Sequence, residues 1–197
     1  MKIYLIRHGE TTGDVEDRYG GDYDDSLSPN GEAQVRGLAK KLVDLGIEVI
    51  YHSPLIRATE SAAIIGETLE VPLVLVDDLK ERNNYGDLTG MIKKEAKEQF
   101  PEEVEELKED PIYHKIPNSE DYYAFAERII NAFNKIAEGE EETVAIITHG
   151  GPIRVIFREV IGFEIEGLAD CAMIELQKED DGTEIMGMDG IGSITPN

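Results

Sequence analysis

Short apolar runs alternate with amphipathic segments along most of the chain. The runs end at polar or ionisable residues, as buried strands of a parallel sheet do; they cover residues 3–6, 47–51, 73–76 and 144–147. The intervening segments have apolar residues at helical spacing. We expect helices that begin at Ser28-Pro29, Ser53-Pro54 and Asn118, with Ser28, Ser53 and Asn118 as N-caps. Strands that alternate with helices predict a three-layer α/β/α sandwich with a largely parallel central sheet.

The pattern changes between residues 79 and 117, where Asn, Gly and acidic side chains dominate. We expect this part to be an inserted helical cap segment within a single domain that spans residues 1–197. Its acidic stretch, residues 95–110, is interpreted as a solvated helix face. A further helix should follow His149, and the runs at 172–176 and 184–188 predict a last hairpin through Asp180-Asp181-Gly182.

The chain is strongly acidic. Lys and Arg total 19 and Asp and Glu total 42, so the net charge is −23. This disfavours general nucleic-acid or membrane-surface binding, which needs a basic face. A local basic pocket for a small anionic substrate still fits, and each arginine in an acidic chain becomes informative.

The remaining composition fits a cytoplasmic protein. The single cysteine, Cys171, forms no internal disulfide and leaves no zinc-type spacing. The first residues lack the apolar stretch of a signal peptide, and no apolar run approaches the length of a membrane helix. The oligomeric state stays open.

Candidate chemistry follows three of the predicted strands. The first ends at Arg7-His8, the second at His52-Ser53 and leads to Arg57, and the fourth at His149-Gly150. Ligands of such folds bind beyond the carboxyl ends of the strands. Two arginines can bind oxyanions bidentately, and a neutral imidazole is a good nucleophile toward phosphorus. We therefore expect a phosphoryl-transfer pocket that requires no metal or other cofactor.

Several motifs occur in a specific order: RHGET at 7–11, GD at 21–22, LSPNGEAQ at 27–34, SPLIRA at 53–58, LKER at 79–82, YG at 85–86 and THGG at 148–151. Together they span nearly the whole chain. The set resembles the histidine phosphatase superfamily, which includes cofactor-dependent phosphoglycerate mutases. The resemblance implies a phosphomonoester phosphatase that works through phosphohistidine without a metal.

The resemblance also implies a role for each matching residue. His8 would be the nucleophile, and Arg7, Arg57 and His149 would bind the transferred phosphoryl group. Glu81 would protonate the leaving oxygen and then activate water. The simpler reading of Glu81, one more surface acid, is weakened by its motif.

Five further residues are substrate-binding candidates: Ser53, Gly150, Tyr85, Lys93 and Asp14. Ser53 and Gly150 lie at predicted helix N-termini, which offer N–H groups to an anion. Tyr85 resembles a pocket tyrosine and Lys93 a substrate lysine of the mutases. Asp14 stands where the family often has an asparagine that contacts phosphate. We expect Asp14 to border the pocket and weaken phosphate binding; the alternative is that it caps a turn.

Three functions compete. A phosphatase is the leading hypothesis. A phosphoglycerate mutase is favoured by Lys93 but disfavoured by the absence of an arginine pair in residues 102–117. A non-catalytic phospholigand-binding module is disfavoured by His8 and Glu81, because binding needs neither a nucleophile nor an acid.

Overall fold

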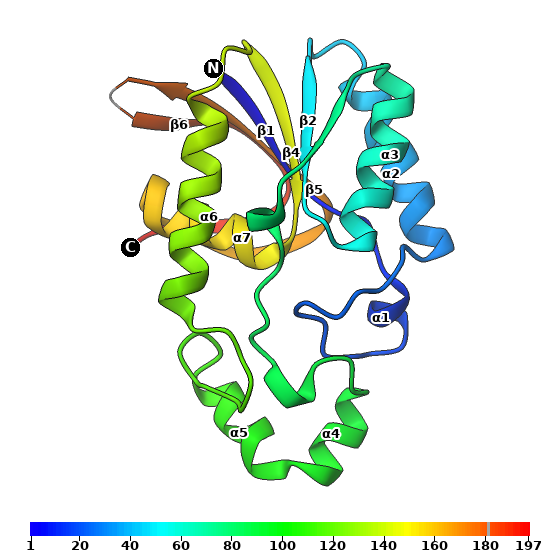
Figure 1. Ribbon diagram of the computed structural model, residues 1–197, viewed down its shortest axis with the longest axis vertical. Coiled ribbons are helices and arrows are strands. Elements are labelled where there is room, and N and C mark those ends of the chain that lie inside the picture. Colours follow the sequence, from blue (N-terminus) through cyan, green and yellow to red (C-terminus); the bar gives the residue numbers. More distant parts are fainter. Residues whose placement is uncertain (181) are drawn as a thin grey trace.

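The computed structural model describes residues 1–180 and 182–197, and its strands form one six-stranded sheet (Figure 1). The strand order is β3-β2-β4-β1-β5-β6. Strands β3, β2, β4 and β1 are parallel to one another. Strand β5 runs antiparallel to β1, and β6 runs antiparallel to β5. The strands are β1 (Lys2–Arg7), β2 (Val49–His52), β3 (Leu73–Leu75), β4 (Thr143–Thr148), β5 (Phe163–Glu179) and β6 (Gly182–Pro196).

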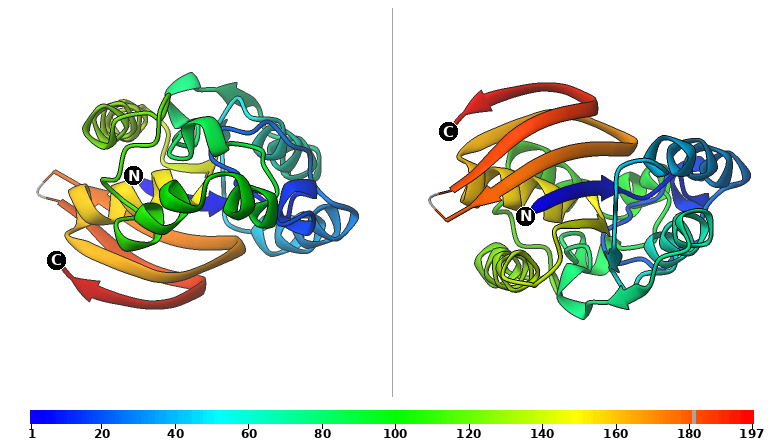
Figure 2. Two further views of the ribbon diagram at one scale, coloured as in Figure 1. Left: turned by 90° about the horizontal axis from the view of Figure 1, so that it is seen from below. Right: turned by 90° about the horizontal axis from the view of Figure 1, so that it is seen from above.

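Helices cover both faces of this sheet. Because side chains alternate along a strand, Ile3 and Leu5 pack with α6 and α7, whereas Tyr4 and Ile6 pack with α2 and α3. The β5–β6 hairpin curves along one side, and α2 and α3 lie at the opposite side (Figure 2). The predicted α/β sandwich is confirmed. The helices are α1 (Thr12–Val15), α2 (Pro29–Leu42), α3 (Ile56–Leu69), α4 (Lys93–Gln99), α5 (Pro101–Glu109), α6 (Tyr122–Ala137) and α7 (Gly150–Val155), with short helices η1 (Asp77–Leu79), η2 (Gly86–Leu88) and η3 (Ile156–Ile161).

The register of the parallel strands aligns their ends. In the β1–β4 pair Arg7 lies opposite Thr148, and in the β2–β4 pair His52 lies opposite Ile147. Beyond these ends the ladder continues: the His8 N–H donates to the carbonyl of Thr148, and the Ser53 N–H to that of Ile147. The residues that follow the three strands therefore meet at one edge of the sheet.

The segment after β3 crosses below this edge and continues into η2, α4 and α5 (Figure 1). These helices have a small core of their own, to which Tyr19 contributes; its other buried members are Leu88, Ala96, Val104, Leu107 and Ile116. The Gly90 N–H donates to the Tyr19 carbonyl, which ties this segment to the N-terminal part of the chain. The acids of 95–110 are exposed, apart from the half-buried Glu103. The assignment of 1–197 to one domain stays a prediction.

Two predicted N-caps are wrong. Helix α3 begins at Ile56, after an extended Leu55, and not directly after Ser53. The cap of α6 is Asp121, whose carboxylate accepts the N–H groups of Tyr123 and Ala124. Ser28 does cap α2, since its Oγ accepts the Gly31 N–H.

The last hairpin is longer than the apolar runs suggested. Register shifts in the β5–β6 pair carry the pairing through polar positions. In the predicted turn, Asp181 lies outside the described residues. Within the residues that the structure describes, no helix is long and apolar enough to cross a membrane.

Candidate active site

His8 follows β1 at the centre of the aligned strand ends and is 5% exposed. Its Nδ1 lies 2.7 Å from the Gly9 carbonyl oxygen, and its Nε2 lies 3.2 Å from Nε of Arg57. A carbonyl only accepts and a guanidinium only donates, so these partners assign the proton to Nδ1 and the lone pair to Nε2. Burial, with the charges of Arg57 and Arg7, lowers the pKa of His8 well below its ordinary value. The imidazole is therefore neutral, with a free nucleophilic nitrogen.

His149 is the N-cap residue of α7 and is fully buried. Its Nδ1 accepts from the same Arg57 Nε at 3.2 Å, and its Nε2 lies 2.6 Å from Oγ of Ser53. The two imidazole centroids are 5.0 Å apart. Burial and the charge of Arg57 also lower the pKa of His149 well below its ordinary value. Two neutral histidines thus face one guanidinium N–H.

Arg57 lies in the first turn of α3 and is 4% exposed. Its Nη1 donates to the Tyr23 carbonyl at 2.6 Å and to Oδ1 of Asp25 at 2.9 Å. Its Nη2 donates to the Gly21 carbonyl at 2.7 Å. These bonds fix the guanidinium plane, so that Nε stays directed at the histidines.

Arg7 is the last residue of β1. Its Nη1 donates to the Leu168 carbonyl at 2.7 Å and lies 3.3 Å from Oδ1 of Asp170. Both partners lie at the irregularity in β5 between Leu168 and Met173. Arg7 Nε is buried and has no hydrogen-bond partner in the described part of the chain. Arg7 therefore retains donor capacity for an oxyanion.

Glu81 lies just after η1, and its half-buried carboxylate reaches the start of α7. Oε2 accepts the Gly151 N–H at 2.9 Å, and Oε1 accepts the Arg82 N–H at 2.8 Å. Burial raises the pKa of Glu81, against the opposing effect of these bonds and of Arg57 and Arg7. Glu81 thus keeps its proton to higher pH than an exposed glutamate does, which suits a general acid.

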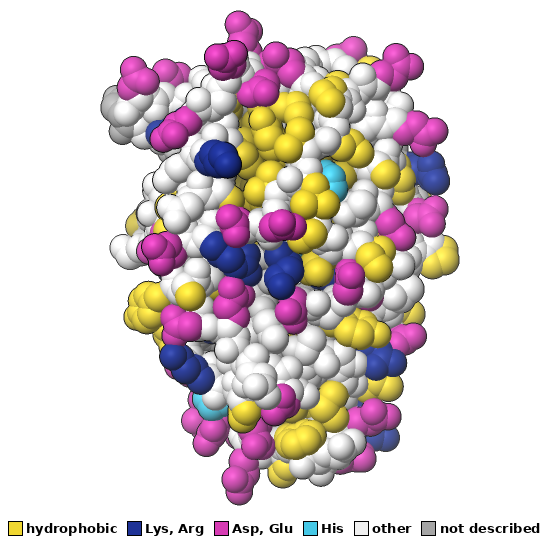
Figure 3. All heavy atoms as spheres, viewed as in Figure 1, with side chains coloured by type: hydrophobic (Ala, Val, Ile, Leu, Met, Phe, Trp, Pro, Cys, Tyr) yellow, Lys and Arg dark blue, Asp and Glu magenta, His cyan; other side chains and the backbone are white. Residues whose placement is uncertain are grey.

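A cleft of about 740 Å³ adjoins this cluster, and Arg7 and Glu81 belong to its lining, whereas His8, Arg57 and His149 lie behind it. Four of the chain's eight arginines line the cleft: Arg7, Arg82, Arg154 and Arg158. Among the described residues, no lysine lines it. Figure 3 shows basic side chains gathered near the middle of one face of an otherwise acid-rich surface. This concentration of arginine in a chain of charge −23 indicates an anionic ligand.

The other sequence candidates have different surroundings. Ser53 contacts His149, and Tyr85 and Gly150 line the cleft. Lys93 does not line the cleft, and its Nζ lies 2.7 Å from Oδ1 of Asp17.

Asp14 forms a capping box with Thr11. Its Oδ2 accepts the N–H and the hydroxyl of Thr11, and its own N–H donates to the hydroxyl oxygen of Thr11. This is the geometry of the turn-cap alternative. The Asp14 charge nevertheless raises the pKa of Asp170, the partner of Arg7, although burial of Asp170 is the main cause.

Sequence reasoning missed several residues of the site. Asp25, Arg154 and Arg158 were not among the candidates, and Arg82 was noted only within a motif. Arg154 had a usable signal, because it stands one helical turn after His149-Gly150 in a chain with few arginines. Asp25 had none, because its contact with Arg57 depends on the path of a loop.

Paired neutral histidines, fixed arginines and a glutamate whose pKa burial raises, all at one edge of an α/β sheet, are the groups that phosphoryl transfer needs. Residues 3–188 match the model of the histidine phosphatase superfamily (branch 1), and the chain belongs to that superfamily. It is a phosphatase of the kind that works through a phosphohistidine intermediate.

Curated relatives and solved structures agree with this family. The chain is 33% identical over 165 residues to the uncharacterized phosphatase PhoE of Bacillus subtilis (strain 168), covering 83% of this chain and 79% of that protein. It is 34% identical over 163 residues to the metal-independent phosphoserine phosphatase of Arabidopsis thaliana, covering 81% and 68%. Bacillus stearothermophilus YhfR shares the fold with a TM-score of 0.87 at 24% identity, covering 98% of both chains.

Proposed function

We propose that this chain hydrolyses small phosphomonoesters that carry a second negative charge, with His8 as nucleophile and Glu81 as acid and base. The observation that carries the catalytic part is the shared Arg57 Nε, which lies 3.2 Å from both His8 Nε2 and His149 Nδ1. A phosphoryl group bound among these three side chains would contact both the lone pair of His8 Nε2 and the cationic guanidinium of Arg57. The proposal needs no metal ion, because the arginines supply the positive charge.

In the first step, His8 Nε2 attacks phosphorus and the bond from phosphorus to the ester oxygen breaks. The proton of Glu81 passes to that oxygen, so the substrate leaves as an alcohol. Arg7 and Arg57 donate hydrogen bonds to the nonbridging oxygens, and His149 adds a donor when its Nδ1 carries a proton. The products are phosphohistidine and a Glu81 carboxylate.

In the second step, the Glu81 carboxylate takes a proton from water. The water oxygen attacks phosphorus and the bond between phosphorus and His8 Nε2 breaks. Inorganic phosphate leaves, and His8 and Glu81 return to their starting protonation states.

Arg154 supports the second part of the proposal. The other cleft arginines have several protein acceptors: Arg158 binds Glu164 and the Tyr122 hydroxyl, and Arg82 binds the carbonyls of Ile112 and Glu120. Arg154 donates to one carbonyl oxygen, that of Ile165, and has no carboxylate partner among the described residues.

The surroundings of Arg154 favour an anion there. Burial and the nearby charges of Arg7 and Arg158 lower its pKa, and the carboxylates of Glu164 and Glu81 offset this only in part. Arg154 follows His149 by five residues, about 7.5 Å along a helix axis. A carboxylate or second phosphate a few bonds from the reacting phosphoryl group can reach both sites.

The test compares two substrates that differ in one carboxylate, phosphoserine and phosphoethanolamine. Arg154→Met should lower kcat/KM for phosphoserine about 10- to 100-fold, the usual effect of a lost charge-assisted hydrogen bond. Phosphoethanolamine should change less than about threefold. Arg36→Met, which removes an exposed cation paired with Glu32, is the matched control. Equal losses on both substrates would contradict an anion site at Arg154.

The catalytic part has its own test. Rapid quenching with substrate, followed by mass spectrometry at alkaline pH, should place one phosphoryl group on the peptide that contains His8. Absence of this adduct while the enzyme turns over would overturn the assignment of His8. Mutase activity on phosphoglycerates is measured in parallel, and we expect none, because Lys93 is paired with Asp17 outside the cleft.

A further inference from the structure

The segment that carries Glu81 has little regular structure of its own. Residues 77–79 form the short helix η1, and Lys80 is extended. Four consecutive carbonyls, those of residues 78–81, nevertheless accept hydrogen bonds from side chains of other elements. Thr148 Oγ1 donates to the Leu79 carbonyl at 2.7 Å. The other three carbonyls share one donor side chain.

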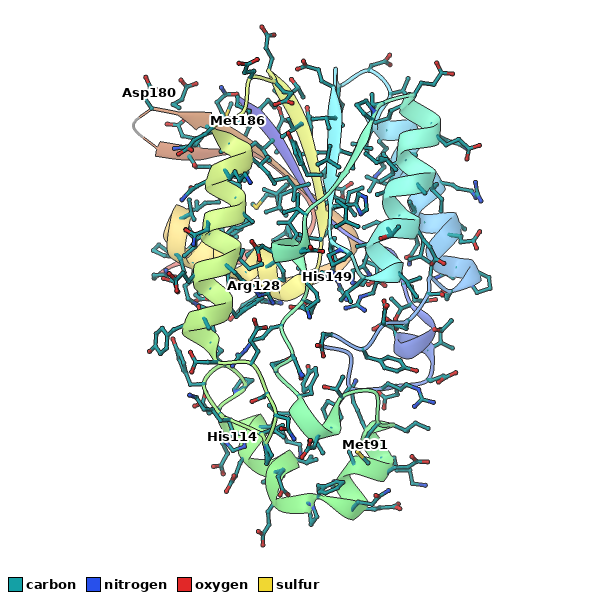
Figure 4. All side chains as sticks on the ribbon, viewed as in Figure 1. Met91, His114, Arg128, His149, Asp180 and Met186 are labelled. Atoms are coloured by element: carbon teal, nitrogen blue, oxygen red, sulfur yellow. The ribbon has the colours of Figure 1, made fainter. Side chains whose placement is uncertain are left out.

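That side chain is Arg128 on α6. Its Nη1 lies 2.8 Å from the Asp78 carbonyl oxygen and 2.7 Å from that of Lys80. Its Nη2 lies 3.3 Å from the carbonyl oxygen of Glu81 itself. Figure 4 places Arg128 at the same end of the sheet as His149. Arg128 therefore spans the backbone on both sides of the point where the Glu81 side chain leaves the segment.

Arg128 is itself held in one orientation. Glu120 binds it through both carboxylate oxygens, at 2.8 Å from Nε and 2.9 Å from Nη2. The guanidinium also lies over the Phe125 ring, 4.8 Å from its centroid. All its nitrogens are engaged with protein acceptors, and Arg128 does not line the cleft. It is thus a fixed donor to backbone and not a ligand for substrate.

Glu120 extends the same support to the residues after Glu81. Its N–H donates to the Asn83 carbonyl at 2.7 Å, and its carbonyl accepts Nε and Nη2 of Arg82. Arg128 on α6 and Glu120, the residue before the cap of α6, therefore tie residues 78 and 80–83 to this helix, and Thr148 ties residue 79 to the sheet. Nothing else among the described side chains binds the carbonyls of Asp78, Lys80 and Glu81.

We infer that Arg128 is a positioning residue for the general acid: it fixes the backbone that aims the Glu81 carboxylate at the leaving oxygen. This inference rests on the acid role proposed above for Glu81. Loss of the three bonds leaves the backbone of residues 80 and 81 without side-chain support, and a displacement of about 1 Å in a catalytic group can cost about 100-fold. Phosphoryl binding by Arg7, Arg57 and His149 does not depend on that segment.

The effect should appear only where the leaving oxygen needs a proton. For an alkyl phosphate such as glycerol phosphate, Arg128→Met should lower kcat/KM roughly 10- to 100-fold, a large part of the usual contribution of a general acid. For 4-nitrophenyl phosphate, whose leaving group needs no proton, kcat/KM should fall less than about threefold. Arg128→Lys keeps the charge and some of the bonds, so it should show the same selectivity with a smaller loss.

The experiment measures both substrates for Arg128→Met, Arg128→Lys, Glu81→Gln and the double variant Glu81→Gln with Arg128→Met. Lys135→Met, the loss of an exposed cation on the same helix, is the control. If Arg128 acts through Glu81, the double variant is no slower on glycerol phosphate than Glu81→Gln alone. If Arg128→Met does not fold, Arg128→Lys carries the same test.

The outcomes separate the two proposals. If Glu81→Gln lowers kcat/KM equally on the alkyl phosphate and on 4-nitrophenyl phosphate, the acid role of Glu81 is wrong, and so is the inference about Arg128. If Glu81→Gln lowers kcat/KM mainly on the alkyl phosphate but the Arg128 variants lower it equally on both substrates, Arg128 is structural or acts on His149. That result overturns the inference alone. Additive losses in the double variant overturn it as well.

Discussion

The position of Glu81 can be tested without touching the glutamate. Gly151 donates its N–H to Glu81 Oε2, and its Cα faces the carboxylate. A Cβ built on Gly151 would lie 2.1 Å from Oε1 and 3.0 Å from Cδ of Glu81. Carbon and oxygen atoms that are not bonded keep more than about 3 Å apart, so Gly151→Ala forces the carboxylate to move by about 1 Å.

The expected magnitude follows from that displacement. Moving a catalytic group by about 1 Å can lower the rate about 100-fold. General acid catalysis typically contributes about 10²- to 10⁴-fold to the rate. We expect kcat/KM of Gly151→Ala to fall roughly 10- to 100-fold on glycerol phosphate and less than about threefold on 4-nitrophenyl phosphate. The fold should persist, because the clash meets the flexible end of a side chain and alanine is a better helix former than glycine.

Gly37→Ala is the matched control. Gly37 also lies in a helix, and a Cβ there has no atom within 4 Å. Melting temperatures of both variants should stay within a few degrees of the parent, or rise. An unchanged rate on glycerol phosphate in Gly151→Ala, or an equal loss on both substrates, would refute the placement of Glu81 as the acid.

Three further outcomes are expected. His8→Ala should abolish turnover while the far-UV circular dichroism spectrum is retained, because the substitution removes the attacking nitrogen; substantial residual activity contradicts this. On alkyl phosphates kcat/KM should fall at low pH as His8 protonates, below the ordinary histidine range, and at high pH as Glu81 ionises, above the ordinary glutamate range; the high-pH loss should vanish in Glu81→Gln. Asp14→Asn keeps an oxygen acceptor for Thr11 and removes a charge near Asp170. The KM for phosphate esters should therefore fall up to about fivefold at neutral pH, and less in acid. If parent and variant have the same KM from pH 5 to 8, Asp14 has only its capping role.

The strand ends were predictable because their placement has a local cause. A short apolar run that stops at Arg7-His8 or His149 identifies both the strand and its end, and parallel pairing then brings the ends together. The helix face of α2 and its Ser28 cap follow from equally local signals. For these residues, the spacing along the sequence is enough to predict the position in space.

Other parts of the site had no local cause to read. Ser-Pro at 53–54 has the form of a helix start, yet the Ser53 hydroxyl lies 2.6 Å from His149 Nε2 and the helix begins later. A tertiary hydrogen bond here outweighs a local capping preference. The partners of Arg7 depend on the register shift in β5, which alternation of polar and apolar residues does not indicate.

The site therefore has two parts, which different kinds of interaction hold in place. His8 and His149 stand at the ends of adjacent paired strands, so sheet hydrogen bonds fix both the proposed nucleophile and the proposed phosphoryl contact. Glu81 stands on an irregular segment held by side chains, chiefly Arg128. We expect a substitution that loosens the segment to alter which leaving groups are tolerated and to leave phosphoryl binding intact. Substrate preference can therefore change through residues that never contact the substrate, while the chemistry on His8 stays the same.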